Sequence, residues 1–223
     1  LQTGSGQNPA RQAAIHAGVD KSKTATTLNQ VCGSGLAAVA LGFSSLKLDD
    51  AKVVIAGGQE SMSNSPHYQT LRKGEKLDNE KMRDSMIIDG LLDVYNQYHM
   101  GVTAENVAEK YQITRAQQDE FAVKSQSKAA EAIKTNRFKD EIVPIKIKDE
   151  KIFDTDEYPK IGTTLEKLAT LKTVFKKDGT VTAGNASGLN DGAAALTIMT
   201  GKTAKEKDLK PLAKIVSWAQ CGV

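Results

Sequence analysis

The stretch that decides the fold is Asn29-Gln30-Val31-Cys32-Gly33-Ser34-Gly35-Leu36-Ala37-Ala38-Val39. It predicts an extended segment that passes through two glycines into a helix of small residues. The amides and positive dipole end of a helix stabilise negative charge, and the glycines leave the sulfur open to approach. We therefore interpret Cys32 as a nucleophile that accepts an acyl group. The alternative is a small buried packing residue, because free cysteine is among the most buried residue types.

The segments on either side of this stretch predict an α/β core. Residues 24–31 favour a strand, residues 35–46 have the apolar spacing of a helix, and residues 52–57 form an apolar run typical of a strand buried on both faces. Strand, helix and strand in this order suggest a crossover unit in a layered core. Two later apolar runs, 192–200 and 212–218, predict further core strands.

Helix signals stand out elsewhere in the chain. Asn8 before Pro9 is a capping side chain followed by the residue that tolerates a first-turn position. Thr103 predicts a helix start, and Thr114 with Gln117 forms a capping box that opens a helix to about residue 135, with Phe121 on its apolar face. Residues 61–102 show no sustained period and predict long surface loops, which in a compact protein are usually functional.

The composition excludes several classes of protein. The 223 residues are 39% hydrophobic and 26% charged, which is typical of a soluble globular protein, and no run is long enough to span a bilayer. The formal net charge of +3 is too small to indicate nucleic-acid binding. Cys32 and Cys221 lie far apart, which favours a reducing compartment, and no ligand spacing predicts a metal site. Leu1 reads as the middle of a domain, so we expect sequence before it.

Three further motifs are candidates for a site. Gly57-Gly58-Gln59-Glu60-Ser61-Met62 follows a predicted strand, where α/β folds place their ligands, although the motif alone favours a tight turn with a solvated glutamate. His99 and Met100 precede a helix and are interpreted either as ligand contacts or as structural residues. Residues 182–192 are rich in glycine and short polar side chains, which suits either a ligand-cradling backbone or a series of turns.

Taken together, the motifs resemble the thiolases, and within them the biosynthetic acetyl-CoA acetyltransferases. The matching segments keep the family order over essentially the whole chain: Gly6-Gln7-Asn8-Pro9-Ala10-Arg11-Gln12, Asn29 to Gly35, Gly57 to Ser63, Tyr98-His99-Met100-Gly101, and Gly184-Asn185-Ala186-Ser187-Gly188-Leu189-Asn190-Asp191-Gly192. Each segment alone is a weak signal, and five in order are a strong one.

The resemblance implies roles for eight residues. Cys32 matches the acyl-accepting nucleophile, whose own N–H contributes to an oxyanion hole. Phe175 matches an aromatic beside the adenine and pantetheine, and Lys160 stands where some relatives carry an arginine near the nucleotide. Lys167 is not one of the eight, because it replaces a serine that some relatives use on the ligand. The positions that match the lining of the coenzyme A and acyl site are Leu91, His99, Met100, Ala183 and Ser187.

The resemblance also implies a fold and a reaction. The fold is a thiolase-like layered α/β core, a mixed sheet with a buried helix layer, carrying an inserted loop domain. Residues 1–61 would belong to the N-terminal half-domain, 62–189 to the loop domain that binds coenzyme A, and 190–223 to the start of the C-terminal half-domain. The reaction is reversible condensation of two acetyl-CoA to acetoacetyl-CoA and coenzyme A. The implied protein is a cytoplasmic enzyme of lipid metabolism, a homodimer or homotetramer without cofactor, metal, membrane or nucleic acid.

The chain departs from the family in what it lacks. The later Asn-Glu-Ala-Phe, Gly-His-Pro and Cys-x-Gly-Gly segments, which supply the activating histidine and second cysteine, do not occur in these residues, and Cys221 is not followed by Gly-Gly. We therefore expect a fragment of a thiolase that is inactive by itself. The alternatives are a non-catalytic thiolase-like scaffold that binds coenzyme A and a ketoacyl-synthase relative, which the long loop region disfavours.

Overall fold

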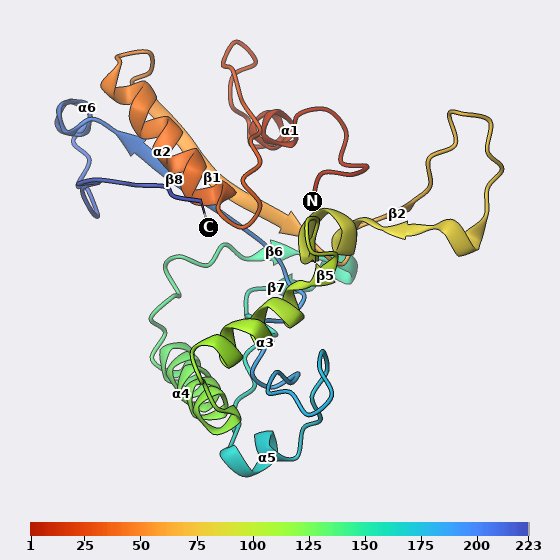
Figure 1. The fold of residues 1–223 in the computed structure, drawn as a ribbon. Coiled ribbons are helices and arrows are strands. Elements are labelled where there is room, and N and C mark those ends of the chain that lie inside the picture. The colour runs from red at the N-terminus through yellow and green to blue at the C-terminus, as the bar shows by residue number, and fades with distance from the viewer. Residues whose placement is uncertain (223) are drawn as a thin grey trace. The chain divides into compact units, whose positions relative to one another are not determined.

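The computed structural model describes residues 1–222, which divide between two units (Figure 1). The first unit holds Leu1–Met86 and the residues from Asn190 onward, and the second holds Ile87–Leu189. Both contain helices and strands, as an α/β chain does. The three domains expected from the sequence rest on family resemblance and stay a prediction.

The first unit is built on one long antiparallel strand pair. β1 (Val53–Ser61) pairs with β8 (Asp191–Met199), in a register that runs from Val53 opposite Met199 to Ser61 opposite Asp191. Helix α2 (Ser34–Lys47) lies along this pair (Figure 1). The remaining elements of the unit are α1 (Pro9–His16), β2 (His67–Tyr68), η1 (Asn79–Lys81), β3 (Arg83–Asp84) and α6 (Gly201–Glu206).

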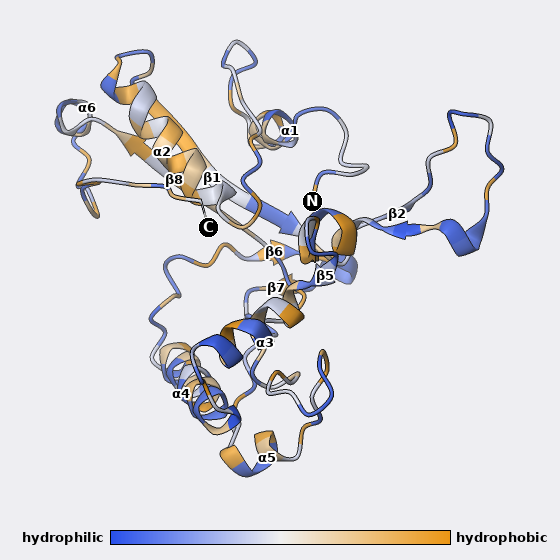
Figure 2. Ribbon diagram, viewed as in Figure 1, coloured by the Kyte–Doolittle hydropathy of each residue, from blue (hydrophilic) through white to orange (hydrophobic). Residues whose placement is uncertain are grey.

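Apolar side chains and one glycine hold α2 on the strands. Its residues are largely hydrophobic, as is the half of β8 that it crosses (Figure 2). Ala40, Gly42 and Leu46 are buried. A Cβ on Gly42 would lie 2.8 Å from Cδ1 of Ile198 and 3.0 Å from Cγ1 of Val54, so the helix approaches the sheet more closely than a side chain there would allow.

The second unit is mainly helical. A π-helical turn, η2 (Ile87–Leu91), leads into the hairpin of β4 (Leu92–Asp93) and β5 (Tyr98–His99). Helices α3 (Met100–Lys110) and α4 (Arg115–Lys134) follow, the latter with the predicted capping box between Thr114 and Gln117 in place. The chain continues through β6 (Ile145–Lys146), η3 (Lys148–Glu150), β7 (Ile152–Phe153) and α5 (Leu165–Ala169).

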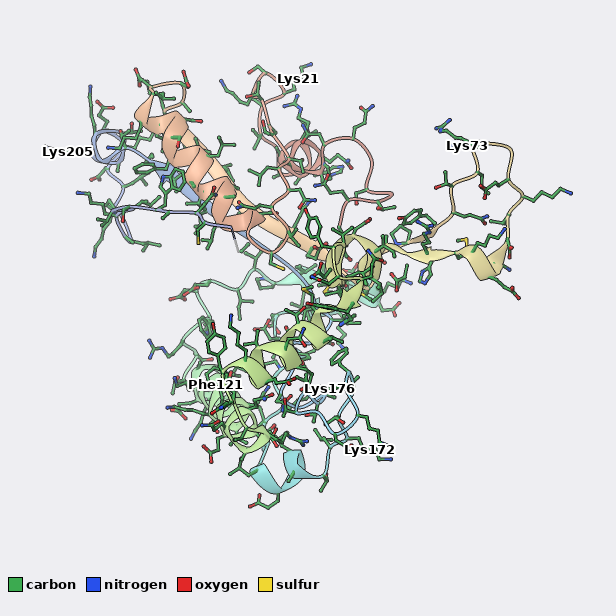
Figure 3. All side chains as sticks on the ribbon, viewed as in Figure 1. Lys21, Lys73, Phe121, Lys172, Lys176 and Lys205 are labelled. Atoms are coloured by element: carbon green, nitrogen blue, oxygen red, sulfur yellow. The ribbon has the colours of Figure 1, made fainter. Side chains whose placement is uncertain are left out.

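Several element predictions were wrong, each where tertiary contacts decide. Residues 24–31 and 212–218 form no strand among the described residues. Residues 24–31 lie instead beside α1, where the Asn8 Nδ2 donates to the Ala25 carbonyl and the Ala10 amide donates to the Thr27 hydroxyl. In residues 212–218, Leu212, Val216 and Trp218 are exposed. β1 is buried only in part. Phe121 projects from α4 into solvent (Figure 3), whereas the buried residue of that helix is Asp119.

Two other boundaries follow local rules. α1 begins at Pro9 with Asn8 as its cap, as predicted, since the Asn8 Oδ1 accepts from the Arg11 amide at 3.2 Å. α3 begins at Met100 rather than at Thr103, because the imidazole of His99 caps it by accepting from the Gly101 amide. No helix among residues 1–222 is both long and apolar enough to cross a membrane.

Candidate functional site

Cys32 lies in a tight turn directly before α2 and is exposed to solvent. Side chains on both sides tie this turn together. The Asn29 Oδ1 accepts from the Val31 amide at 2.8 Å, while the Ser34 Oγ accepts from the Gln30 amide at 2.8 Å and donates to the Val31 carbonyl at 2.6 Å. These hydrogen bonds therefore fix Cys32 two residues before the first residue of α2, with its side chain exposed.

The residue before the cysteine has an unusual backbone. Val31 adopts φ 51°, a left-handed conformation that a β-branched side chain rarely takes. Such residues persist where surrounding contacts enforce them, and they cluster at functional sites. The sequence alone does not predict this left-handed conformation. The only sequence signal for it is that Asn29 and Ser34, two turn-forming residues, flank a valine.

We expect Val31→Gly to stabilise the chain by about 0.5–1 kcal/mol. Relief of the left-handed conformation gains about 1–2 kcal/mol, and the greater freedom of glycine in the unfolded chain offsets about 0.5–1 kcal/mol of that gain. Val31 is 61% exposed, so little packing is lost. Urea denaturation measures the change. Val31→Ala removes the same branched side chain without access to positive φ, so equal shifts in the two variants would contradict the interpretation.

Two glycines let the start of α2 approach β1. A Cβ on Gly58 would lie 3.3 Å from the Cα of Gly35, which is closer than ordinary packing. At the far end of β1, the Asp191 carboxylate accepts from both the amide and the hydroxyl of Ser63, and these hydrogen bonds hold the pKa of Asp191 below its usual value. The motif 57–63 is thus fixed to the start of β8, within the same unit as Cys32.

In the second unit, His99 and Phe175 form an aromatic stack. Their ring centroids are 4.8 Å apart and the rings are inclined by 16°. The His99 Nδ1 accepts from the Gly101 amide at 2.9 Å, so the neutral ring carries its hydrogen on Nε2 and offers a donor there. Gly101 permits the stack, because a Cβ at that position would overlap the Phe175 ring.

Leu91 and Met100 lie close to this stack. Leu92 pairs with His99 across the β4–β5 hairpin, which places Leu91 one residue from the position opposite His99. Met100 is 38% exposed at the first turn of α3. It lines an apolar cavity of about 360 Å³ together with Thr103, Ala104, Val107, Ala108, Ile113 and Gln118.

The remaining predicted positions lie along residues 158–188. Ala183 and Ser187 are exposed on a loop whose Thr182 is fully buried. The Thr182 backbone pairs with Thr173, which brings this loop beside the segment that carries Phe175. The Lys160 ammonium lies 5.9 Å from the centre of the Tyr158 ring. Tyr158 in turn packs on Gly188 and donates to the Ala186 carbonyl at 3.4 Å.

The second unit therefore gathers seven of the eight sequence-predicted site residues, and Cys32 belongs to the first unit. One residue that supports the site, Glu105, is absent from the sequence-predicted set. Glu105 is only 3% exposed, and its signal in the sequence is helical spacing with Gly101 and Ala108, a buried stripe on which a charged residue is unusual. Among residues 1–222 no group of three or more histidine, cysteine, aspartate or glutamate side chains could hold a metal ion.

Comparison with known proteins identifies relatives of the whole chain. The sequence pattern of the family described as thiolase, N-terminal domain, matches residues 1–202. An acetyl-CoA acetyltransferase of Rhizobium meliloti (strain 1021) is 57% identical over 226 residues, which cover 100% of this chain and 58% of that protein. The chain thus spans 58% of the length of the curated relatives it matches.

Two solved structures share the fold. The Acat5 thiolase from Ascaris suum, in complex with coenzyme A, matches with a TM-score of 0.90 and 37% identity, over 100% of this chain and 57% of that one. The acetyl-CoA acetyltransferase of Bacillus anthracis matches with a TM-score of 0.88 and 44% identity, over 94% of this chain and 54% of that one. These likenesses confirm the predicted fold class.

Proposed function

Because this chain belongs to the thiolase family, we propose that it supplies the nucleophile and the coenzyme A cradle of an acetyl-CoA acetyltransferase. The observation that carries the proposal is the exposed Cys32 in its enforced turn, two residues before the first residue of α2. The names of the relatives, at 52–57% identity across this chain, support the reaction class.

The proposed step is acyl transfer from acetyl-CoA to Cys32. Cys32 loses its proton to solvent and its thiolate attacks the thioester carbonyl. The bond between the acetyl carbon and the Cys32 sulfur forms as the bond between that carbon and the coenzyme A sulfur breaks, and the departing thiolate takes up a proton from solvent. The Gly33 and Ser34 amides donate to backbone carbonyls within the turn, at 3.0 and 3.1 Å, so they are committed elsewhere. The oxyanion donor that the thiolase resemblance implies is the amide of Cys32 itself.

The cradle consists of the residues gathered in the second unit. His99 offers Nε2–H as a donor beside the flat face of Phe175, and Met100 opens on an apolar cavity. The exposed Ala183 and Ser187 present backbone groups to a phosphorylated ligand. Lys160, whose ammonium lies over the Tyr158 ring, adds a positive charge. The coenzyme A in the Ascaris suum structure supports this assignment.

The proposal extends to the complete protein. Its product is acetoacetyl-CoA, formed when a carbanion from a second acetyl-CoA attacks the acetylated Cys32 and releases the thiolate. Coenzyme A thioesters are its substrates, with no further cofactor. Its working form is a homo-oligomer and its compartment the cytoplasm.

The test is the intact mass of the chain after incubation with acetyl-CoA. We expect a single added acetyl group that is absent in Cys32→Ala. Cys221 is a matched control, because it is also an exposed free cysteine and lies outside the described turn before α2. We therefore expect Cys221→Ala to be acetylated as the unaltered chain is. Equal acetylation of the two cysteines, or its survival in Cys32→Ala, would refute the assignment of the nucleophile.

A further inference from the structure

The buried Glu105 connects α3 to the loop that carries Ala183 and Ser187. Its Oε1 accepts from the Thr180 amide at 2.9 Å and from the Val181 amide at 2.8 Å. Its Oε2 accepts from the Thr180 amide and the Thr180 hydroxyl, both at 2.9 Å. One carboxylate thus binds two consecutive backbone amides that lie 75 and 76 residues further along the chain.

The surroundings of Glu105 are shaped for this contact. Gly179 must be glycine, because a Cβ there would overlap the Glu105 carboxylate. Burial by itself disfavours the charged form, but the hydrogen bonds from Val181 and Thr180 outweigh it and hold the pKa of Glu105 below its usual value. The carboxylate is therefore ionised at neutral pH and makes charge-assisted hydrogen bonds, which are stronger than neutral ones.

Helix α4 holds the same loop from a second side. The Gln118 Nε2 donates to the Thr180 hydroxyl at 2.9 Å. The Asn185 Nδ2 donates to the Thr180 carbonyl and to the buried Asp119 carboxylate, both at 3.0 Å, and its Oδ1 accepts from the Thr182 amide at 2.7 Å. Arg115 completes the set by donating to Asp119 at 2.8 Å.

These contacts hold the loop on the side that faces α3 and α4, and they leave the side chains on its other side exposed. Thr180, Val181 and Asn185 are hydrogen-bonded to α3 or α4, whereas Ala183 and Ser187, the two positions assigned to the ligand, are exposed. Glu105 makes four of the bonds and is the residue that reaches the loop from α3. Its loss would release the loop without removing any group that touches ligand.

We propose that Glu105 is a positioning residue, which holds residues 180–185 so that Ala183 and Ser187 lie where coenzyme A is bound. This inference rests on the proposed function, because it concerns the same ligand. The hydrogen bonds of Glu105 preorganise the loop. A preorganised site binds its ligand more tightly, because less conformational entropy is lost on binding.

The test compares Glu105→Gln with Glu109→Gln in the 223-residue chain. Glutamine keeps the size of the side chain but turns one acceptor into a donor that faces the Thr180 amide. Glu109 lies one turn further along α3, with a 72% exposed side chain that pairs with Lys176, so its variant is the matched control. Hydrogen exchange measures the exchange rates of the loop amides. Calorimetry measures the affinity for coenzyme A, and circular dichroism measures the helix content.

We expect exchange at Thr180 and Val181 to become at least about tenfold faster in Glu105→Gln, with affinity for coenzyme A about tenfold or more weaker and helix content unchanged. Glu109→Gln should match the unaltered chain in all three. Unchanged exchange in Glu105→Gln would overturn the proposal, and so would faster exchange with unchanged affinity.

Two further results are informative. If Glu105→Gln does not fold, Thr180→Val removes only the hydroxyl that bridges Glu105 and Gln118, and unchanged loop exchange and affinity in that variant would overturn the proposal. If the unaltered chain does not bind coenzyme A, the proposal that the second unit binds this ligand is refuted. The exchange comparison then decides separately whether Glu105 holds the loop.

Discussion

The purified 223-residue chain is expected to form no measurable acetoacetyl-CoA from acetyl-CoA. Condensation needs one base that activates the nucleophilic thiol and another that removes a proton from the α-carbon of the second acetyl-CoA. The thiolase resemblance assigns these tasks to Gly-His-Pro and Cys-x-Gly-Gly segments, and neither occurs in the sequence. Groups that act as a unit lose almost all activity when one is missing, so we expect a rate at least about 10⁴-fold below that of a full-length relative.

A coupled assay of coenzyme A release and acetoacetyl-CoA absorbance measures this rate, with a full-length relative in parallel. Acetylation of Cys32 by the same preparation serves as the control for a folded nucleophile, because that step removes no proton from an α-carbon and the Cys32 thiol loses its proton to solvent. Acetoacetyl-CoA that forms at a rate near that of the relative, and that disappears in Cys32→Ala, would show that these residues hold a complete catalytic set.

The Gly101→Ala variant is expected to lose the His99–Phe175 stack and with it at least about tenfold in affinity for coenzyme A. A Cβ at Gly101 would occupy the space of the Phe175 ring, so the ring must leave its place against His99. Overpacking of this kind costs about 1–3 kcal/mol, which outweighs the roughly 1 kcal/mol that alanine gains over glycine in a helix. Thermal denaturation and calorimetry with coenzyme A measure the two effects.

Gly201→Ala provides the matched control. Gly201 is the first residue of α6, and a Cβ there meets nothing within 4 Å. The same substitution at a helix start should therefore be neutral or slightly stabilising and leave affinity unchanged. If Gly101→Ala behaved in the same way, the close approach of Phe175 to Gly101 would contribute neither to stability nor to affinity for coenzyme A.

The helix boundaries that the sequence predicted best are those set by neighbours in the chain. Asn8 and Pro9 begin α1, and Thr114 with Gln117 begins α4, because a cap joins residues three positions apart. The start of α3 was misplaced because the cap is a histidine, a residue outside the usual set. The predicted strand 212–218 failed because its hydrophobicity does not supply a partner strand.

The sequence by itself determined which residues are candidates, because motif order and residue chemistry are properties of the chain. Cys32 before a helix of small residues, and the polar glycine-rich run 182–192, are visible without coordinates. The tertiary structure alone decided how they are held. The left-handed Val31 lies in a turn that its near neighbours Asn29 and Ser34 tie together, and coordinates are needed to see it. The His99–Phe175 stack and the hydrogen bonds of the buried Glu105 depend on partners about 75 residues away. No local pattern encodes such contacts, since they form only when the helices and loops meet.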